Sequence, residues 1–211
     1  DFKPFAKKII KAKLGIDIEK NSKELCIDEK KKKLIVGFSG SLRFDNKAFK
    51  ALSRIKREDI QILLFGVISG KQEKLFENQD IIKEKFLKYE EYIKRMKEIK
   101  PDLLIAPLSF DRTSSSKCYN KYLENSSIGA ATLFSKVPPY VNVVKENETG
   151  FFVEEETVDG WCNSIENILN DRELLFNVQK NAYNDVLNNH SVDTFLSWFM
   201  DTIKRIIKEG V

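Results

Sequence analysis

The sequence predicts an α/β protein built on a doubly wound parallel sheet. Three observations support this prediction. Short apolar runs recur along the chain, segments with one apolar face lie between them, and the apolar runs end in turns rich in small residues or proline. Apolar runs without alternation suit strands that are buried on both faces of a parallel sheet. Strands that alternate with helices favour a Rossmann-like arrangement, here followed by C-terminal helices.

The strands are predicted from these apolar runs, in chain order. LIVGFSG, QILLFG and DLLIAPL are the clearest, whereas AATLFS and FFV are weaker signals. A further strand, poorly marked, is expected near Lys85 to Leu87. The predicted strands therefore lie at 34–40, 61–66, 85–87, 102–108 and 130–135, and from 151 onward.

The helices are predicted from apolar residues that recur at helical spacing. Thr157 is a good N-cap for one of them, and Asp171 can cap the next. The predicted helices lie at 46–56, 89–99, 117–127, 157–170, from 171, and at 192–208, with a short amphipathic helix around 5–14. Ligands of such sheets bind at the carboxyl ends of the strands, so we expect function at the turns after Phe38, Phe65, Ala106 and Phe134.

Composition limits the class of protein. The lysine-rich stretch 1–33 is interpreted as an N-terminal segment or linker, and 34–211 as one domain. A net charge of +4 is too small to indicate nucleic-acid binding. Three cysteines without CxxC spacing, and a lone histidine, predict no zinc site and fit a cytosolic protein with reduced thiols. The chain begins at Asp1 without a Met and carries no signal-peptide pattern, so we interpret it as a fragment or a single domain.

The stretch 117–127 carries the clearest chemical signal. On a helix, Lys117, Asn120, Lys121 and Glu124 fall within an arc of about 100°, opposite Cys118, Tyr119, Tyr122 and Leu123. Two cations near a helix N-terminus can bind phosphate, and a carboxylate further along can accept hydrogen bonds from a ribose diol. The alternative is an ordinary surface helix in which Lys121 and Glu124 form an i,i+3 ion pair.

An ordered series of motifs resembles a known family. LIVGFSGSLRFDNKAF is similar to a first strand with its glycine loop, KYLENSSIGAATLFSKVPPY to a glutamate-bearing helix followed by a strand and a proline–tyrosine turn, and NETGFFV to a closing hairpin. In this order they resemble the C-terminal, donor-binding domain of GT-B glycosyltransferases of the retaining family 4 group. The resemblance runs from Leu34 to about Asn188 and implies one half of a GT-B fold.

The resemblance implies roles for the residues of this helix. The family has two glutamates eight residues apart, of which the second binds the ribose and corresponds to Glu124. The first contacts the transferred sugar and corresponds here to Ser116, which brings no charge and is the candidate catalytic position. Lys117, Asn120 and Lys121 are expected to share in donor binding.

The resemblance also implies a pyrophosphate clamp in the first loop. In the family an arginine follows the loop glycine and a lysine comes five residues later. Here Gly40 is followed by Ser41, and Asn46 stands at the lysine position. We expect Gly40 and Ser41 to contact the donor, and Arg43 and Lys47 to replace the clamp from shifted positions.

These correspondences imply a glycosyltransferase, of hexosyltransferase type and retaining. Its donor is a UDP or GDP sugar, and fixed cations rather than a metal or other cofactor stabilise the departing diphosphate. The chain has room for one GT-B half, so the N-terminal acceptor-binding domain is missing and the isolated domain is expected to be inactive. The family suggests a bacterial, cytoplasmic protein that can associate with the inner membrane face, where a membrane-bound acceptor is extended into a surface polysaccharide or glycolipid.

Two other functions remain open. Ser116 and the displaced clamp favour a degenerate transferase domain that acts as a non-catalytic binding or regulatory module. An unrelated Rossmann-like nucleotide or phosphate binder is the third alternative, although neither GxGxxG nor GxxxxGK[ST] occurs in the sequence.

Overall fold

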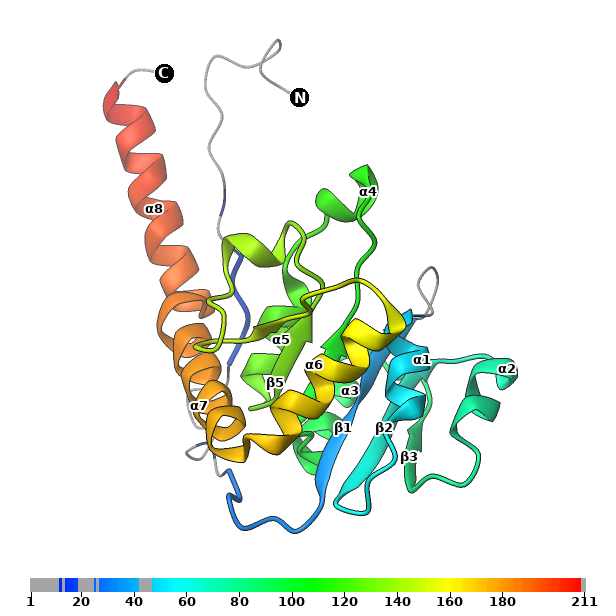
Figure 1. The fold of residues 1–211 in the computed structure, drawn as a ribbon. Helices are drawn as coiled ribbons and strands as arrows, with labels where there is room; N and C mark the ends of the chain where they lie inside the picture. Colours follow the sequence, from blue (N-terminus) through cyan, green and yellow to red (C-terminus); the bar gives the residue numbers. More distant parts are fainter. Residues whose placement is uncertain (1–11, 13, 19–24, 26, 42–46, 210–211) are drawn as a thin grey trace.

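Six parallel strands form a single sheet in the order β3-β2-β1-β4-β5-β6 (Figure 1). The structure is a computed structural model and describes residues 12, 14–18, 25, 27–41 and 47–209. Each strand pair is parallel. The strands are β1 Leu34–Ser41, β2 Ile60–Val67, β3 Ile81–Glu84, β4 Leu103–Ala106, β5 Ala131–Phe134 and β6 Phe151–Phe152. The predicted doubly wound α/β sheet is thereby confirmed.

Helices connect most of the strands, and further helices follow the last strand in the sequence. They are α1 Lys47–Arg54, α2 Gly70–Glu73, α3 Tyr89–Ile99, α4 Arg112–Ser115, α5 Asn120–Ser127, α6 Val158–Asn170, α7 Arg172–Asn189 and α8 Val192–Glu209, with 3-10 turns at Lys74–Phe76 and Tyr140–Asn142. The predicted caps are confirmed, because Thr157 accepts a hydrogen bond from Gly160 N and Asp171 accepts one from Leu174 N. Both caps satisfy backbone donors that the first helical turn leaves unpaired.

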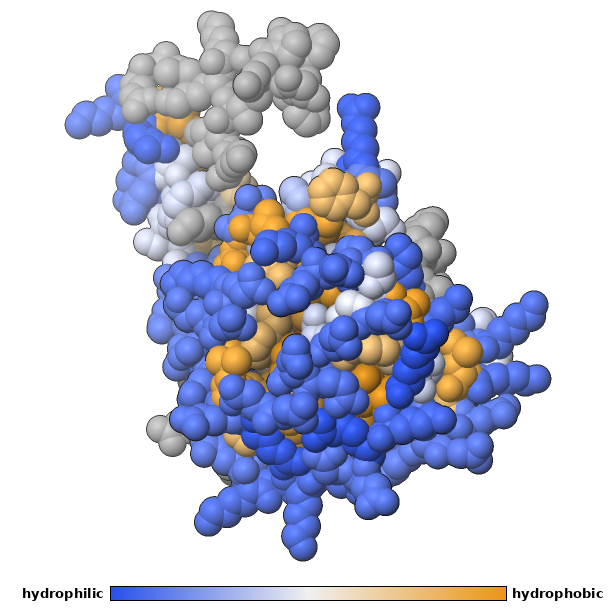
Figure 2. Space-filling model, in the orientation of Figure 1, coloured by the Kyte–Doolittle hydropathy of each residue, from blue (hydrophilic) through white to orange (hydrophobic). Residues whose placement is uncertain are grey.

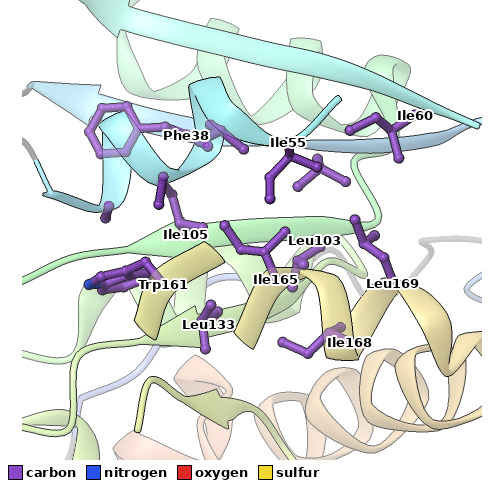
Figure 3. Packing of buried hydrophobic residues seen from close by; sticks show 14 of the residues in the cluster. Phe38, Ile55, Ile60, Leu103, Ile105, Leu133, Trp161, Ile165, Ile168 and Leu169 are labelled. Carbon is purple, nitrogen blue, oxygen red and sulfur yellow. The ribbon is translucent and has the colours of Figure 1, made fainter. Parts of the chain in front are cut away.

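One face of the sheet is covered by α1 and α6. Figure 3 shows Trp161 and Ile165 of α6 packed over Leu103 and Ile105 of β4, with Phe38 of β1 at one end of the cluster. These side chains are all buried. The apolar face of α6 therefore fixes how the connection after β6 returns across the sheet.

The opposite face of the sheet is covered by α3 and, toward β5 and β6, by α5 and α7. Ile35 of β1, Phe65 of β2 and Leu104 of β4 form a second cluster with Met96 of α3. Because successive strand residues point to opposite faces, β1 contributes to both clusters. This explains why the strand runs read as continuously apolar rather than alternating.

The third strand differs from its prediction. β3 ends at Glu84, whereas a strand near Lys85 to Leu87 was predicted, so that prediction is wrong. β3 is an edge strand that pairs with β2 alone. Its charged residues form ion pairs, Lys83 with Glu73 at 2.6 Å and Glu84 with Arg95 at 2.6 Å. Charged side chains are typical of strands at sheet edges and hide the apolar signal of a buried strand.

The described part of the N-terminal segment lies against the C-terminal helices. Ile16 N donates to His190 O at 2.8 Å, and Val192 N donates to Ile16 O at 3.2 Å. Ile16 and Ile18 are buried in a cluster with residues of α5 and α7. The division of the chain at Leu34 stays a prediction, and the helix predicted around 5–14 falls almost wholly outside the described residues.

The last helix extends beyond the end of the sheet (Figure 1). Leu196, Phe199, Met200 and Ile207 of α8 are exposed. On the face seen in Figure 2, hydrophilic side chains cover most of the body and apolar ones are interspersed among them. None of the helices in the described ranges combines the length and apolar character that crossing a membrane requires.

A buried carboxylate joins the strands at the amino end of the sheet. Asp102, just before β4, accepts hydrogen bonds from Ile35 N at 2.6 Å and from Lys31 Nζ at 2.7 Å. Its backbone oxygen accepts hydrogen bonds from Ala131 N at 3.1 Å and Gln179 Nε2 at 3.1 Å. Burial raises the pKa of Asp102, and its partners oppose that shift. One residue thus links β1, β4, β5 and α7.

Replacing this carboxylate should destabilise the protein. Asp102→Ala leaves the buried amide of Ile35 without its side-chain acceptor and Lys31 without its counterion, which we expect to lower the free energy of unfolding by about 3 kcal/mol. Chemical denaturation measures the change. Asp201→Ala is the matched control, because Asp201 is exposed and its ion pair with Lys204 is long at 4.0 Å. Equal stability of the two variants would contradict a structural role for Asp102.

Candidate functional site

The sheet opens beside the carboxyl end of β1. The chain leaves β1 through α1 on one face, and it enters β4 from α3 on the other face. Pairing of β1 with β4 ends at Phe38 and Ile105, whereas pairing with β2 continues to Ser41. The point at which the strand order reverses is the usual ligand site of a doubly wound sheet. Ser39 and Gly40 therefore occupy the position where a ligand is expected.

A cleft of about 200 Å³ lies at this point. Most of its lining is apolar or aromatic, and two charged residues, Lys121 and Glu124, come from α5. Phe86 and Tyr89 are strongly exposed, with 73% and 54% of their surfaces accessible. The lining residues are Gly40, Phe65, Gly66, Phe86, Leu87, Tyr89, Tyr92, Lys121 and Glu124. An apolar cleft with a few charged groups at one side is typical of small-molecule sites.

Two glycines allow the backbone to form one rim of the cleft. Gly66 pairs with Gly40, and its φ of +121° is one that other residues rarely adopt. A Cβ at Gly66 would lie 2.1 Å from Gly40 O. Gly40 also has a positive φ, and a Cβ there would lie 3.9 Å from Lys121 Cε. The ends of β1 and β2 thus approach each other, and Lys121 reaches the glycine turn.

The helix that carries the charged residues begins later than predicted. α5 begins at Asn120, not at Lys117, because a separate short helix, α4, precedes it. Asp111 begins α4 by accepting hydrogen bonds from Ser114 N at 2.8 Å and Ser114 Oγ at 3.0 Å. The hydroxyl-rich stretch 113–116 therefore forms the end of α4 and its C-cap, and no side-chain hydrogen bond caps the start of α5. Asp111 thus has a structural role as the N-cap of α4.

The changed helix start alters which predicted site residues meet. Gly40, Lys121 and Glu124 lie together in the cleft lining. Ser41, Lys47, Lys117 and Asn120 are exposed and are not among the residues that line this cleft, and Arg43 falls outside the described residues. Cys118 was predicted on the helix side opposite the charged residues, but it precedes α5 and is exposed.

The candidate catalytic position lies at the end of α4. Ser116 is exposed, and its hydroxyl donates to Arg112 O at 2.9 Å. It is not among the residues that line the cleft. Within the described residues, no group of three histidine, cysteine or acidic side chains is arranged to hold a metal ion. The prediction that no metal or other cofactor takes part stays a prediction.

Lys121 and Glu124 form the charged part of the cleft. Lys121 Nζ lies 2.8 Å from Glu124 Oε2 and 3.4 Å from Ser39 Oγ. Only 31% of the Lys121 side chain and 18% of the Glu124 side chain are exposed. Burial lowers the pKa of Lys121, but the neighbouring Tyr92 and Glu124 outweigh it and leave that pKa raised. Lys121 is therefore charged at neutral pH.

Sequence analysis missed the aromatic residues that support this ion pair. The Tyr92 ring lies beneath Lys121 Nζ, 5.3 Å from ring centroid to nitrogen, and Tyr92 Oη lies 3.0 Å from Ser39 Oγ. Phe65 packs edge-on against Tyr92 with centroids 5.1 Å apart. The apolar spacing that placed α3 in the sequence indicated its buried face, but no local signal linked Tyr92 to β1.

A second cavity, of about 340 Å³, lies at the opposite, amino end of β2. It is lined by Ile55, Lys56, Arg57, Glu58, Ile60, Ile62, Glu77, Asn78, Gln79 and Asp80. Arg57 binds Asp59 and Glu166 in ion pairs of 2.8 and 2.9 Å. These pairs join β2 to α6, which is a structural use of the charges.

The glycine rim generates a prediction about stability. Gly66→Ala places a Cβ against the Gly40 carbonyl in a strained backbone conformation, so we expect a loss of about 2 kcal/mol in the free energy of unfolding. Denaturant titration measures it. Gly70→Ala is the control, because a Cβ at Gly70 meets nothing within 4 Å. If Gly66→Ala were as stable as this control, the close approach of β1 and β2 would be refuted.

Solved structures resemble the chain in fold. The HepE protein of Anabaena in complex with UDP-glucose matches with a TM-score of 0.60 and 17% identity, over 82% of this chain and 49% of HepE. Sucrose-phosphate synthase from Thermosynechococcus elongatus matches with a TM-score of 0.64 and 17% identity, over 88% and 47%. The C-terminal domain of the glycosyl transferase group 1 family protein LpcC from Francisella tularensis matches with a TM-score of 0.59 and 14% identity, over 79% and 100%.

The chain spans about half the length of the first two of these proteins and the full length of the LpcC domain. These likenesses concern the fold. None of the curated proteins matches the sequence. The family model for glycosyl transferases group 1 matches residues 17–185, which include both charged residues of the cleft. The chain therefore belongs to the glycosyl transferases group 1 family.

Proposed function

We propose that this chain binds the nucleoside diphosphate sugar donor of a glycosyltransferase, in the cleft at the carboxyl end of β1. The observation that carries the proposal is the Lys121–Glu124 pair beside an aromatic cleft at the strand-order reversal. The pair supplies a cation for phosphate and a carboxylate for hydroxyl groups. The aromatic lining supplies a surface for a nucleobase.

The nucleoside fits the chemistry of the lining. Phe86 and Tyr89 are exposed aromatic residues of the cleft, and a base can stack on such rings. Glu124 Oε2 accepts a hydrogen bond from the Lys121 ammonium. The carboxylate has further acceptor sites for a ribose diol. The structure of HepE with UDP-glucose supports a donor of this class, because it shares the fold.

We expect the Lys121 ammonium to bind the phosphates of the donor. Transfer of the sugar leaves negative charge on the departing diphosphate, and a fixed ammonium stabilises that charge. Gly40 and Gly66 allow phosphate oxygens to approach backbone at the ends of β1 and β2. We propose that the donor is a UDP or GDP hexose and that no metal is required.

We propose that acceptor binding and sugar transfer require a larger protein than this chain. Because the chain spans about half of HepE, we propose that an N-terminal acceptor-binding domain completes the transferase. The reaction we propose is retaining transfer to a saccharide or lipid, in polysaccharide or glycolipid synthesis in the cytoplasm of a bacterium, at the inner membrane face.

One observation favours a second candidate function. Ser116 is exposed, is not in the cleft lining, and donates to the backbone of its own helix. A site that binds a donor without a carboxylate at this position suits a non-catalytic binding or regulatory module. Both functions predict nucleotide binding, and they differ in whether sugar is transferred by the complete protein.

Removing the proposed ribose acceptor should weaken nucleotide binding. Glu124→Ala is expected to cost about 1.5–3 kcal/mol of binding free energy, the range for hydrogen bonds to a charged group. Calorimetric titration with UDP, GDP and ADP measures it and identifies the base. Glu148→Ala is the matched control, because it removes another i,i+3 pair with a lysine at 2.8 Å, outside the cleft. Unchanged UDP and GDP affinity in Glu124→Ala would exclude the ribose role.

The isolated chain should bind donor without transferring sugar. Positioning both reactants supplies much of the rate of a two-substrate enzyme, and the proposed acceptor surface lies in another domain. We expect no product when the purified chain is incubated with UDP- or GDP-hexoses and saccharide acceptors, analysed by mass spectrometry. Transfer by this chain alone would overturn the proposed division of labour.

A further inference from the structure

We propose that Tyr92 is a positioning residue of the donor site, which holds the Lys121 ammonium at the carboxyl end of β1 so that Lys121 binds the diphosphate. This inference rests on the proposed function. It assigns a phosphate cation to α5, supported from α3.

Lys121 is held from three directions. Glu124 lies 2.8 Å from its ammonium on the same helix, Ser39 lies 3.4 Å away on β1, and the Tyr92 ring lies below it at 5.3 Å. A lysine side chain has a flexible four-carbon stem and loses much conformational entropy when it is fixed. A lysine held in advance loses less freedom on binding phosphate, which strengthens that binding.

Tyr92 is itself fixed at both ends. Its hydroxyl lies 3.0 Å from the hydroxyl of Ser39, a buried residue with 3% of its surface exposed. Its ring meets the edge of Phe65, which is also buried. Because Ser39 and Phe65 are opposite each other in the pairing of β1 with β2, the sheet determines where the Tyr92 ring lies. The ring then determines where the ammonium lies.

The location of the ammonium suits a diphosphate. A Cβ at Gly40 would lie 3.9 Å from Lys121 Cε, so the lysine runs beside the glycine turn where β1 separates from β4. Lys121 is the only cation among the described residues that line the cleft. With 31% of its side chain exposed, it interacts with a ligand more strongly than a fully solvated lysine does.

The inference is tested by comparing a diphosphate with its nucleoside. Wild type and variants are titrated with UDP and uridine, or with GDP and guanosine where the protein prefers guanine. Lys121→Met should lower diphosphate affinity about tenfold or more and change nucleoside affinity less than about twofold. Lys121→Arg should restore part of the diphosphate affinity, because it restores the charge.

Two conservative variants test the positioning role. Tyr92→Phe and Ser39→Ala each remove the hydroxyl contact between α3 and β1, and each should lower diphosphate affinity about threefold without an effect on the nucleoside. Tyr119→Phe is the control, because it removes a tyrosine hydroxyl that accepts from Leu14 N outside the cleft. In a Lys121→Met background, Tyr92→Phe should have no further effect on diphosphate affinity, because it acts through the lysine.

The outcomes separate this inference from the proposed function. An unchanged ratio of diphosphate to nucleoside affinity in Lys121→Met would overturn the inference while donor binding stands. If wild type bound neither ligand, the proposed function would fail as well. Additive losses in the double variant would remove the positioning role of Tyr92. Circular dichroism and thermal unfolding check each fold, and Lys121→Gln replaces Lys121→Met where the latter unfolds.

Discussion

The site depends on the parallel pairing of β1 with a neighbour on each side. β1 is buried on both faces because it lies between β2 and β4 and meets both helical layers. Its pairing with β4 stops at Phe38, three residues before its pairing with β2 stops at Ser41. That difference in length opens the sheet at Ser39 and Gly40. The cleft is thus a consequence of strand register, and the side chains of α3 and α5 give it chemistry.

Local patterns in the sequence predicted most of the fold. Apolar runs placed five of the strands, because a strand buried on both faces needs apolar side chains throughout. Thr157 and Asp171 marked helix starts because their side-chain oxygens bond to backbone donors nearby. β3 was misplaced because an edge strand carries charged residues. The start of α5 was misplaced because Asp111 begins a separate short helix, α4, just before it.

The candidate site was predicted only in part, and its long-range contacts explain why. Gly40, Lys121 and Glu124 came from the family resemblance and from helical spacing, and the structure places them in one cleft. Tyr92 was missed because its partner Ser39 lies 53 positions away in the sequence. Such a contact leaves no periodic signal, since it depends on how α3 packs against the carboxyl end of β1. The binding roles of all these residues remain predictions.

The two interpretations of the Lys121–Glu124 pair differ in what they explain. Lys145 and Glu148 form an i,i+3 pair of the same 2.8 Å, but 65% and 56% of their side chains are exposed, so it contributes little to stability. The Lys121–Glu124 pair keeps 31% and 18% exposure, and taking charges out of water opposes folding. A surface helix needs no such arrangement. A site for a charged ligand does, because partly buried charges interact more strongly with a ligand than solvated ones.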